Sequence, residues 1–105
     1  MSKFVNIYHQ KRTIFTTKDY VIKIEMVLDR TDEKVGIEFP ESYKFRWMAF
    51  NIDNKDEFVR FDNHTGKLPH WHDNSKQGKL EWRGLELTEE LFYQKVKEKF
   101  GDFDY

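Results

Sequence analysis

Residues 60–73 hold most of the side chains in this chain that could do chemistry near neutral pH. Three of the four histidines in the 105-residue sequence fall here, together with two aspartates, an arginine and a lysine. A group of histidines can exchange protons or bind metal ions, because the ordinary pKa of histidine lies close to neutrality. Gly66 and Pro69 interrupt the segment, which predicts a turn between two extended stretches. His70 and His72 would then point to the same side, since alternate residues of a strand share a face.

One interpretation of this segment is acid–base chemistry on RNA without a metal ion. Cleavage through attack of a 2′-hydroxyl group needs a base, an acid and a cation near the phosphate. Two of the histidines could exchange the protons, and Arg60 or Lys67 could supply the cation. Asp62 could accept a ring proton from a histidine and so fix its tautomer.

The same residues are compatible with two other interpretations. His70 and His72 on an extended segment could converge on one metal ion with Asp62 or His64. Alternatively, the segment is structural: Asp62 and Asn63 bond the backbone of the turn, Arg60 pairs with Asp62 or Asp73, and the histidines pack against Trp71 and neighbouring rings.

We assign no metal ligand and no cofactor to the predicted site. It comprises four candidate catalytic residues and four candidate substrate-binding residues. The catalytic set is Asp62, His64, His70 and His72, and the binding set is Arg60, Asn63, Lys67 and Trp71. Trp71 is included because an indole ring can stack on a nucleic acid base.

The composition predicts one domain with an aromatic core. The chain has ten Phe, five Tyr and three Trp but no Cys, which excludes disulfides and fits a cytoplasmic protein. No apolar run is long enough to cross a membrane, so we expect no membrane association. The net charge of −1 argues against bulk electrostatic coating of nucleic acid. However, residues 1–23 and 60–83 are mildly basic, and they would form a cationic face if they met in space.

Strands occupy most of the predicted fold. Alternation of apolar and polar residues predicts a strand over residues 20–29 and a hairpin formed by residues 43–52 and 57–62. The end of residues 43–52 is apolar on both faces, which suggests that a helix covers it. Shorter strands are expected over residues 4–8, 13–16 and 79–83, and a short edge strand over residues 35–39.

A helix is predicted at the C-terminus. Thr88 is a suitable N-cap, Gly101 a suitable end, and Phe92, Val96 and Phe100 form an apolar stripe between them. The last residues, 101–105, are expected to be loose. The predicted fold class is therefore α+β: a single antiparallel sheet of four to six strands in hairpins, with one C-terminal helix packed on one face.

The order of these motifs resembles a known family. The segment Arg60-Phe61-Asp62-Asn63, then His64 and Gly66, then Pro69-His70-Trp71-His72, follows a hairpin and precedes a helix. In this it is similar to the TumE family of small prokaryotic toxin–antitoxin proteins, over residues 43–100. The polar loop at residues 73–78 departs from the more compact pattern of that family. The resemblance implies a small α+β domain of prokaryotic origin, acting on RNA together with a partner protein.

We expect the chain to be a toxin–antitoxin-like protein that binds or cleaves RNA through residues 60–73. Its expected partners are RNA and a cognate antitoxin-like protein, and the chain itself is expected to be a monomer or a small homo-oligomer. The alternative is a non-enzymatic interaction module, whose partner covers a sheet edge or an aromatic patch and whose His/Asp turn is structural.

Overall fold

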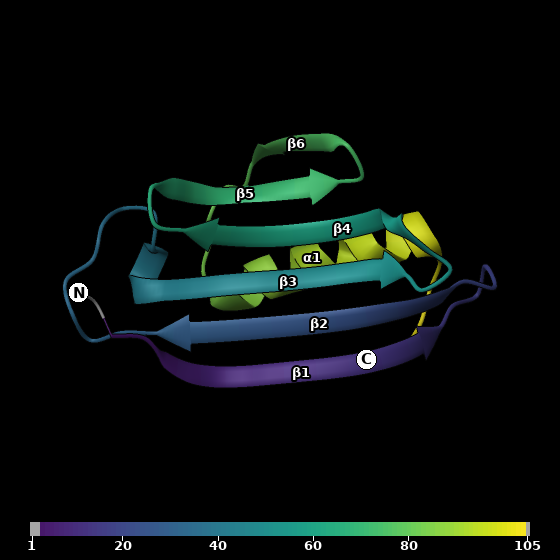
Figure 1. The fold of residues 1–105 in the computed structure, drawn as a ribbon, viewed down its shortest axis with the longest axis horizontal. Helices are drawn as coiled ribbons and strands as arrows, with labels where there is room; N and C mark the ends of the chain where they lie inside the picture. The colour runs from purple at the N-terminus through teal and green to yellow at the C-terminus, as the bar shows by residue number, and fades with distance from the viewer. Residues whose placement is uncertain (1–2, 105) are drawn as a thin grey trace.

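Six strands follow one another in the computed structural model, and each pairs in antiparallel fashion with the next (Figure 1). The structure describes residues 3–104. The strands are β1 (Val5–Phe15), β2 (Val21–Arg30), β3 (Tyr43–Asn51), β4 (Asn54–His64), β5 (Lys67–Asp73) and β6 (Lys76–Lys79). A short 3₁₀ helix (Pro40–Ser42) precedes β3, and the helix α1 (Leu85–Phe100) follows β6. The predicted α+β fold with one sheet and one C-terminal helix is confirmed.

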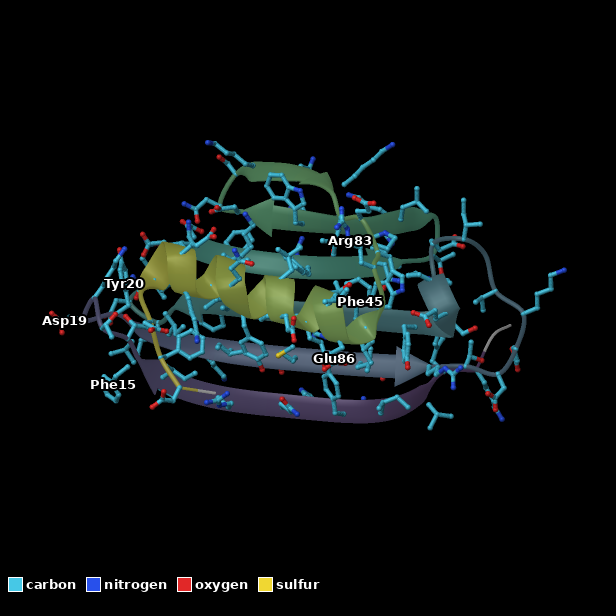
Figure 2. All side chains as sticks on the ribbon, turned by 180° about the vertical axis from the view of Figure 1, so that it is seen from behind. Phe15, Asp19, Tyr20, Phe45, Arg83 and Glu86 are labelled. Carbon is cyan, nitrogen blue, oxygen red and sulfur yellow. The ribbon has the colours of Figure 1, made fainter. Side chains whose placement is uncertain are left out.

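Helix α1 packs on one face of the sheet and leaves the other face uncovered. Figure 1 looks onto the uncovered face, with α1 behind the strands, and Figure 2 shows the helix from the opposite side, lying across the sheet. Alternation sends Ile22, Ile24, Met26 and Leu28 of β2 toward the helix, where they are buried. Phe92, Val96 and Phe100 meet them from α1, as the apolar stripe predicts.

The core between sheet and helix is largely aromatic. Trp47 lies at its centre with no exposed surface, and its ring is 6.0 Å from that of Phe92 and 4.8 Å from that of Phe45. Phe61 contacts Phe92 edge-on at 5.3 Å. Offset and edge-on arrangements of this kind are those that aromatic rings prefer. Among the described residues the structure contains no helix long and apolar enough to cross a membrane.

A glycine lies at each end of the helix, and the observed start differs from the predicted one. Gly84 precedes α1 with φ 98° and ψ 158°, and Gly101 follows it with φ 101° and ψ 167°. This region of backbone space is essentially restricted to glycine. The helix therefore begins at Leu85 rather than after Thr88, whose hydroxyl donates a hydrogen bond back to the Gly84 carbonyl at 2.7 Å.

Several of the weaker strand predictions were wrong. Residues 4–8 and 13–16 belong to one strand, β1, because pairing with β2 continues through the polar residues between them. Residues 35–39 form a turn, in which the Phe39 amide donates to the Gly36 carbonyl at 3.1 Å, and not a strand. The last strand ends at Lys79 instead of running over residues 79–83.

Two further expectations about packing were also wrong. Met48 and Phe50 lie on the uncovered face of the sheet, since they alternate with the buried Trp47 and Ala49, so no helix covers that face of β3. The tail is anchored rather than loose: Phe103 is buried, and the Asp102 amide donates to the Thr17 hydroxyl at 2.9 Å. Tyr105 lies outside the described residues.

Candidate functional site

The β4–β5 hairpin brings four of the predicted site residues together on the uncovered face. Its register places Asp62 opposite His70 and Arg60 opposite His72. These four side chains point away from the helix, because Phe61 and Trp71, which lie between them in sequence, point toward it. We call Arg60, Asp62, His70 and His72 the histidine cluster.

Both ring nitrogens of His70 lie close to oxygen atoms of the protein. Nδ1 lies 3.0 Å from the Leu68 carbonyl oxygen, and Nε2 lies 2.6 Å from Oδ1 of Asp62. The imidazole is buried, with 9% of its side chain exposed. A carbonyl oxygen can only accept a hydrogen bond, so Nδ1 carries a hydrogen atom.

The contact between His70 and Asp62 is close but is not an aligned hydrogen bond. Although the two atoms are 2.6 Å apart, Oδ1 accepts no hydrogen bond of good geometry from any described residue. The ring nitrogen therefore points past the carboxylate oxygen rather than at it. The other carboxylate oxygen, Oδ2, lies 3.2 Å from Nε of Arg60, whose N–H also lacks an aligned acceptor among the described residues.

Arg60 links the carboxylate to the second histidine. Its Nη2 atom donates a hydrogen bond of 3.1 Å to Nε2 of His72, because a guanidinium group has no acceptor. Burial, and then the positive charge of Arg60, lower the pKa of His72 below its usual value. His72 is therefore a neutral imidazole at neutral pH, and its Nε2 carries the lone pair.

Of the remaining predicted residues, His64 lies at the edge of this cluster, and Asn63, Lys67 and Trp71 lie outside it. His64 is exposed at the end of β4, with its ring 6.2 Å from that of His70, and Lys67 faces it across the turn. Asn63 is buried and accepts a hydrogen bond from the Phe45 amide at 2.8 Å. Trp71 packs against the core on the helix side, so it does not share a surface with His70.

A groove on the helix side of the sheet lies apart from the face that carries the cluster. It has a volume of about 690 Å³ and lies between α1 and the strands β5 and β6. Trp71 and His72 are among its lining residues, whereas Arg60, Asp62 and His70 are not. Of the predicted acid–base residues only His72 borders this groove, whereas Asp62 and His70 lie on the open sheet surface.

Sequence reasoning missed the surroundings of the cluster on the uncovered face. In one row across the strands, Val27 is opposite Arg46, and Arg46 is opposite Asp62. In the neighbouring row, Glu25 is opposite Met48, and Met48 is opposite Arg60. The next row ends in the directly opposed, half-buried rings of Phe50 and Phe58. The sequence of the hairpin does indicate this face, because residues 44, 46, 48 and 50 alternate with positions that are buried in the core.

The uncovered face is also cationic, although the whole chain is not. On β1 to β4 the register places five basic side chains and three carboxylates on this face. They are Lys11, Lys23, Lys44, Arg46 and Arg60, with Glu25, Asp29 and Asp62. Two of the five basic residues, Lys44 and Arg46, come from the middle of the sequence, and residues 60–83 contribute only Arg60, which lies beside Asp62.

No protein-family model matches the chain, and no curated protein and no solved structure is significantly similar to it. The fold and the histidine cluster define the class of the protein only as a six-stranded antiparallel sheet with one covered face. Its function must therefore be inferred from the chemistry of its own surfaces.

Proposed function

We propose that this protein binds single-stranded RNA across the uncovered face of its sheet, with the histidine cluster at one side of the binding surface. The observation that carries the proposal is the mixture of basic side chains and half-buried rings on that face. Phe50 and Phe58 lie side by side in the register, and the guanidinium of Arg60 lies 6.0 Å from the Phe58 ring. Proteins that bind single strands combine cations for the phosphates with aromatic rings for the bases.

The same face fits a protein partner less well. The centres of protein–protein interfaces are depleted in charged residues. Here charged residues stand between the apolar ones: Lys23 is opposite Phe50, and Arg60 is opposite Met48. The resemblance of residues 60–72 to the TumE family supports the same ligand class, since it implies action on RNA, and it adds an antitoxin-like partner to the proposal.

The geometry supports binding more directly than cleavage. His70 and Asp62 are largely buried, with 9% and 13% of their side chains exposed, and Nε2 of His72 accepts a hydrogen bond from Arg60. Binding requires only that the phosphates and bases reach the cations and rings of the face. Cleavage is a separate outcome, which the same samples reveal on a denaturing gel.

The test measures binding of a labelled single-stranded RNA of mixed sequence by fluorescence anisotropy. We expect affinity to fall as salt rises from about 50 to 200 mM, because each phosphate contact releases counterions. Arg46→Gln should weaken binding and reduce the slope of log K against log salt by about 0.7, the value for one phosphate contact on a single strand. Phe58→Leu should weaken binding about 5- to 100-fold, because it removes a stacking ring but keeps most of the apolar volume.

Lys95→Gln is the matched control, since Lys95 is an exposed cation on α1, on the other side of the molecule. It makes the same change in net charge and should leave both affinity and salt slope unchanged. Wild-type protein that does not bind RNA at about 50 mM salt would overturn the proposal and favour an interaction module. Equal losses in Arg46→Gln and Lys95→Gln would place the bound RNA elsewhere and would also overturn it.

A further inference from the structure

We infer that Asp62, His70 and His72 form a binding site for a divalent first-row transition metal ion such as Zn²⁺. One ligand atom from each of these residues lies within 4.8 Å of the other two. Two imidazoles and one carboxylate form a ligand set that suits such ions and leaves coordination positions open. This inference does not depend on the proposed binding of RNA.

The first argument comes from the tautomer of His70. Because Nδ1 donates its hydrogen to the Leu68 carbonyl oxygen, Nε2 of the neutral ring carries a lone pair. That lone pair lies 2.6 Å from a carboxylate oxygen, so two acceptors face each other. Such a pair is stable only with a cation between the two atoms, which is either a proton or a metal ion. A hydrogen bond from Nδ1 to a backbone carbonyl is also the usual way in which a metal-bound histidine is held.

The second argument concerns which cation fits. A proton shared by His70 and Asp62 would lie on a straight line from Nε2 to Oδ1, but Oδ1 receives no aligned hydrogen bond from any residue that the structure describes. Nε2 of His70 is therefore not committed to a straight hydrogen bond with Asp62, which leaves its lone pair available to a metal ion. Both side chains are largely buried, with 9% of His70 and 13% of Asp62 exposed.

The third argument concerns Arg60, whose positive charge lies where a bound metal ion would lie, between His72 and Asp62. Its guanidinium donates to Nε2 of His72 and lies against Oδ2 of Asp62, so it touches two of the three ligands. About a third of this side chain is exposed, so it can turn toward solvent when an ion binds. Ligand atoms around a tetrahedral ion, with bonds of about 2.0–2.1 Å, lie about 3.3 Å apart. Small rotations of the three side chains would reach that spacing.

The experiment measures the melting temperature of the full chain, freed of metal with a chelator, while Zn²⁺ is added. An ion that binds the folded state stabilises it by mass action, so the melting temperature should rise with Zn²⁺ concentration. Mg²⁺ should have little effect, since it prefers an all-oxygen shell. Asp62→Asn and His72→Ala should each weaken Zn²⁺ binding at least about 10- to 100-fold, the cost of losing even an outer contact of a metal site.

Two further variants separate a metal site from a structural network. Arg60→Met removes the competing cation, so a metal site predicts tighter Zn²⁺ binding, whereas a network of ion pairs predicts only lower stability. His9→Ala is the matched control: it removes a histidine from the same face, and its ring pairs with Glu25 at 2.9 Å, away from the cluster. It should leave Zn²⁺ binding unchanged.

A readout independent of stability is the NMR signal of each histidine ring. Zn²⁺ should shift the ring signals of His70 and His72 and leave those of His9 in place. No melting shift and no ring shift with Zn²⁺ would overturn the inference, as would full Zn²⁺ binding by His72→Ala. The RNA experiment tests a different property, because binding of RNA by metal-free protein would support the proposed function whatever the result with Zn²⁺.

Discussion

Asn63 shows how a residue of the predicted site can serve the fold instead. Its side-chain oxygen accepts from the Phe45 amide, and its nitrogen donates to the carbonyl oxygens of Glu38 at 2.7 Å and Tyr43 at 3.0 Å. With only 3% of the residue exposed, these bonds tie β4 to the start of β3 and to the loop before it. A role in binding substrate stays a prediction, but all three of these contacts are internal.

We predict that Asn63→Ala lowers the free energy of unfolding by about 2–4 kcal/mol. The substitution leaves a buried amide and two carbonyls without their partners, and each orphaned group costs about 1–3 kcal/mol. Urea denaturation measures the loss. Asn54→Ala is the control, because Asn54 is exposed and accepts a hydrogen bond from the Asp56 amide at the start of β4. It should cost less than about 1 kcal/mol, and equal losses would contradict our account of Asn63.

At the scale of elements, the end of α1 is docked on the turn between β1 and β2. The Thr16 hydroxyl donates to the Phe100 carbonyl oxygen at 2.5 Å, and the Thr17 amide donates to the Asp102 carbonyl oxygen at 3.0 Å. Figure 2 shows Tyr20, at the end of this turn, beside the end of the helix, where its ring lies 5.3 Å from that of Phe100. Gly101 allows the close approach: a Cβ atom there would lie 2.9 Å from the Lys18 backbone nitrogen.

We predict that Gly101→Ala destabilises the protein by about 3 kcal/mol. About 1–3 kcal/mol comes from placing a side chain in a backbone region that only glycine readily adopts, and the clash with Lys18 adds to it. Gly66→Ala is the matched control, since Gly66 also has a positive φ, of 78°, but a Cβ atom there would have nothing within 4 Å. It should cost only about 1–2 kcal/mol. Thermal or urea unfolding of both variants measures the difference, and equal costs would show that the docking of the helix end is not tight.

At the scale of the whole molecule, one hydrogen bond joins the first strand to the helix across most of the sequence. The Tyr8 hydroxyl donates to a carboxylate oxygen of Glu89 at 2.7 Å. Burial, and then this hydrogen bond, raise the pKa of Tyr8 well above its usual value of about 10. The bond is lost if the hydroxyl ionises, so the folded state holds the proton more tightly than the unfolded state does.

We predict that Tyr8 makes the protein less stable in alkali. A group whose pKa is raised by folding stabilises the protein fully below its unfolded pKa and loses that contribution as pH rises above it. The stability difference between wild type and Tyr8→Phe should therefore be constant near pH 8 and shrink above about pH 10. Urea midpoints at several pH values measure it. Glu89→Gln should keep part of the pH dependence, because Tyr8 stays buried, and a constant difference up to pH 11 would contradict the assignment.

The amino-acid sequence by itself determined the fold class and the two sides of each strand. Period-2 alternation placed Ile22, Ile24 and Met26 in the core, and the same alternation put His70 and His72 on one face together. These patterns are local, since each depends on residues a few positions apart. The two glycines at the helix ends are also visible in the sequence, but the capping signal of Thr88 misplaced the start, because Gly84 adopts a conformation that sequence patterns do not reveal.

Only the tertiary structure decided which residues of the site meet. The register of β4 against β5 sets Asp62 beside His70 and Arg60 beside His72, and a shift of one residue would turn every side chain of a strand to the other face. The position of α1 decides which face stays open, so Trp71 packs into the covered side while its neighbours in sequence face solvent. Local sequence patterns predict which residues share a face of a strand. The contacts between strands, and which face of the sheet the helix covers, depend on how the whole chain packs.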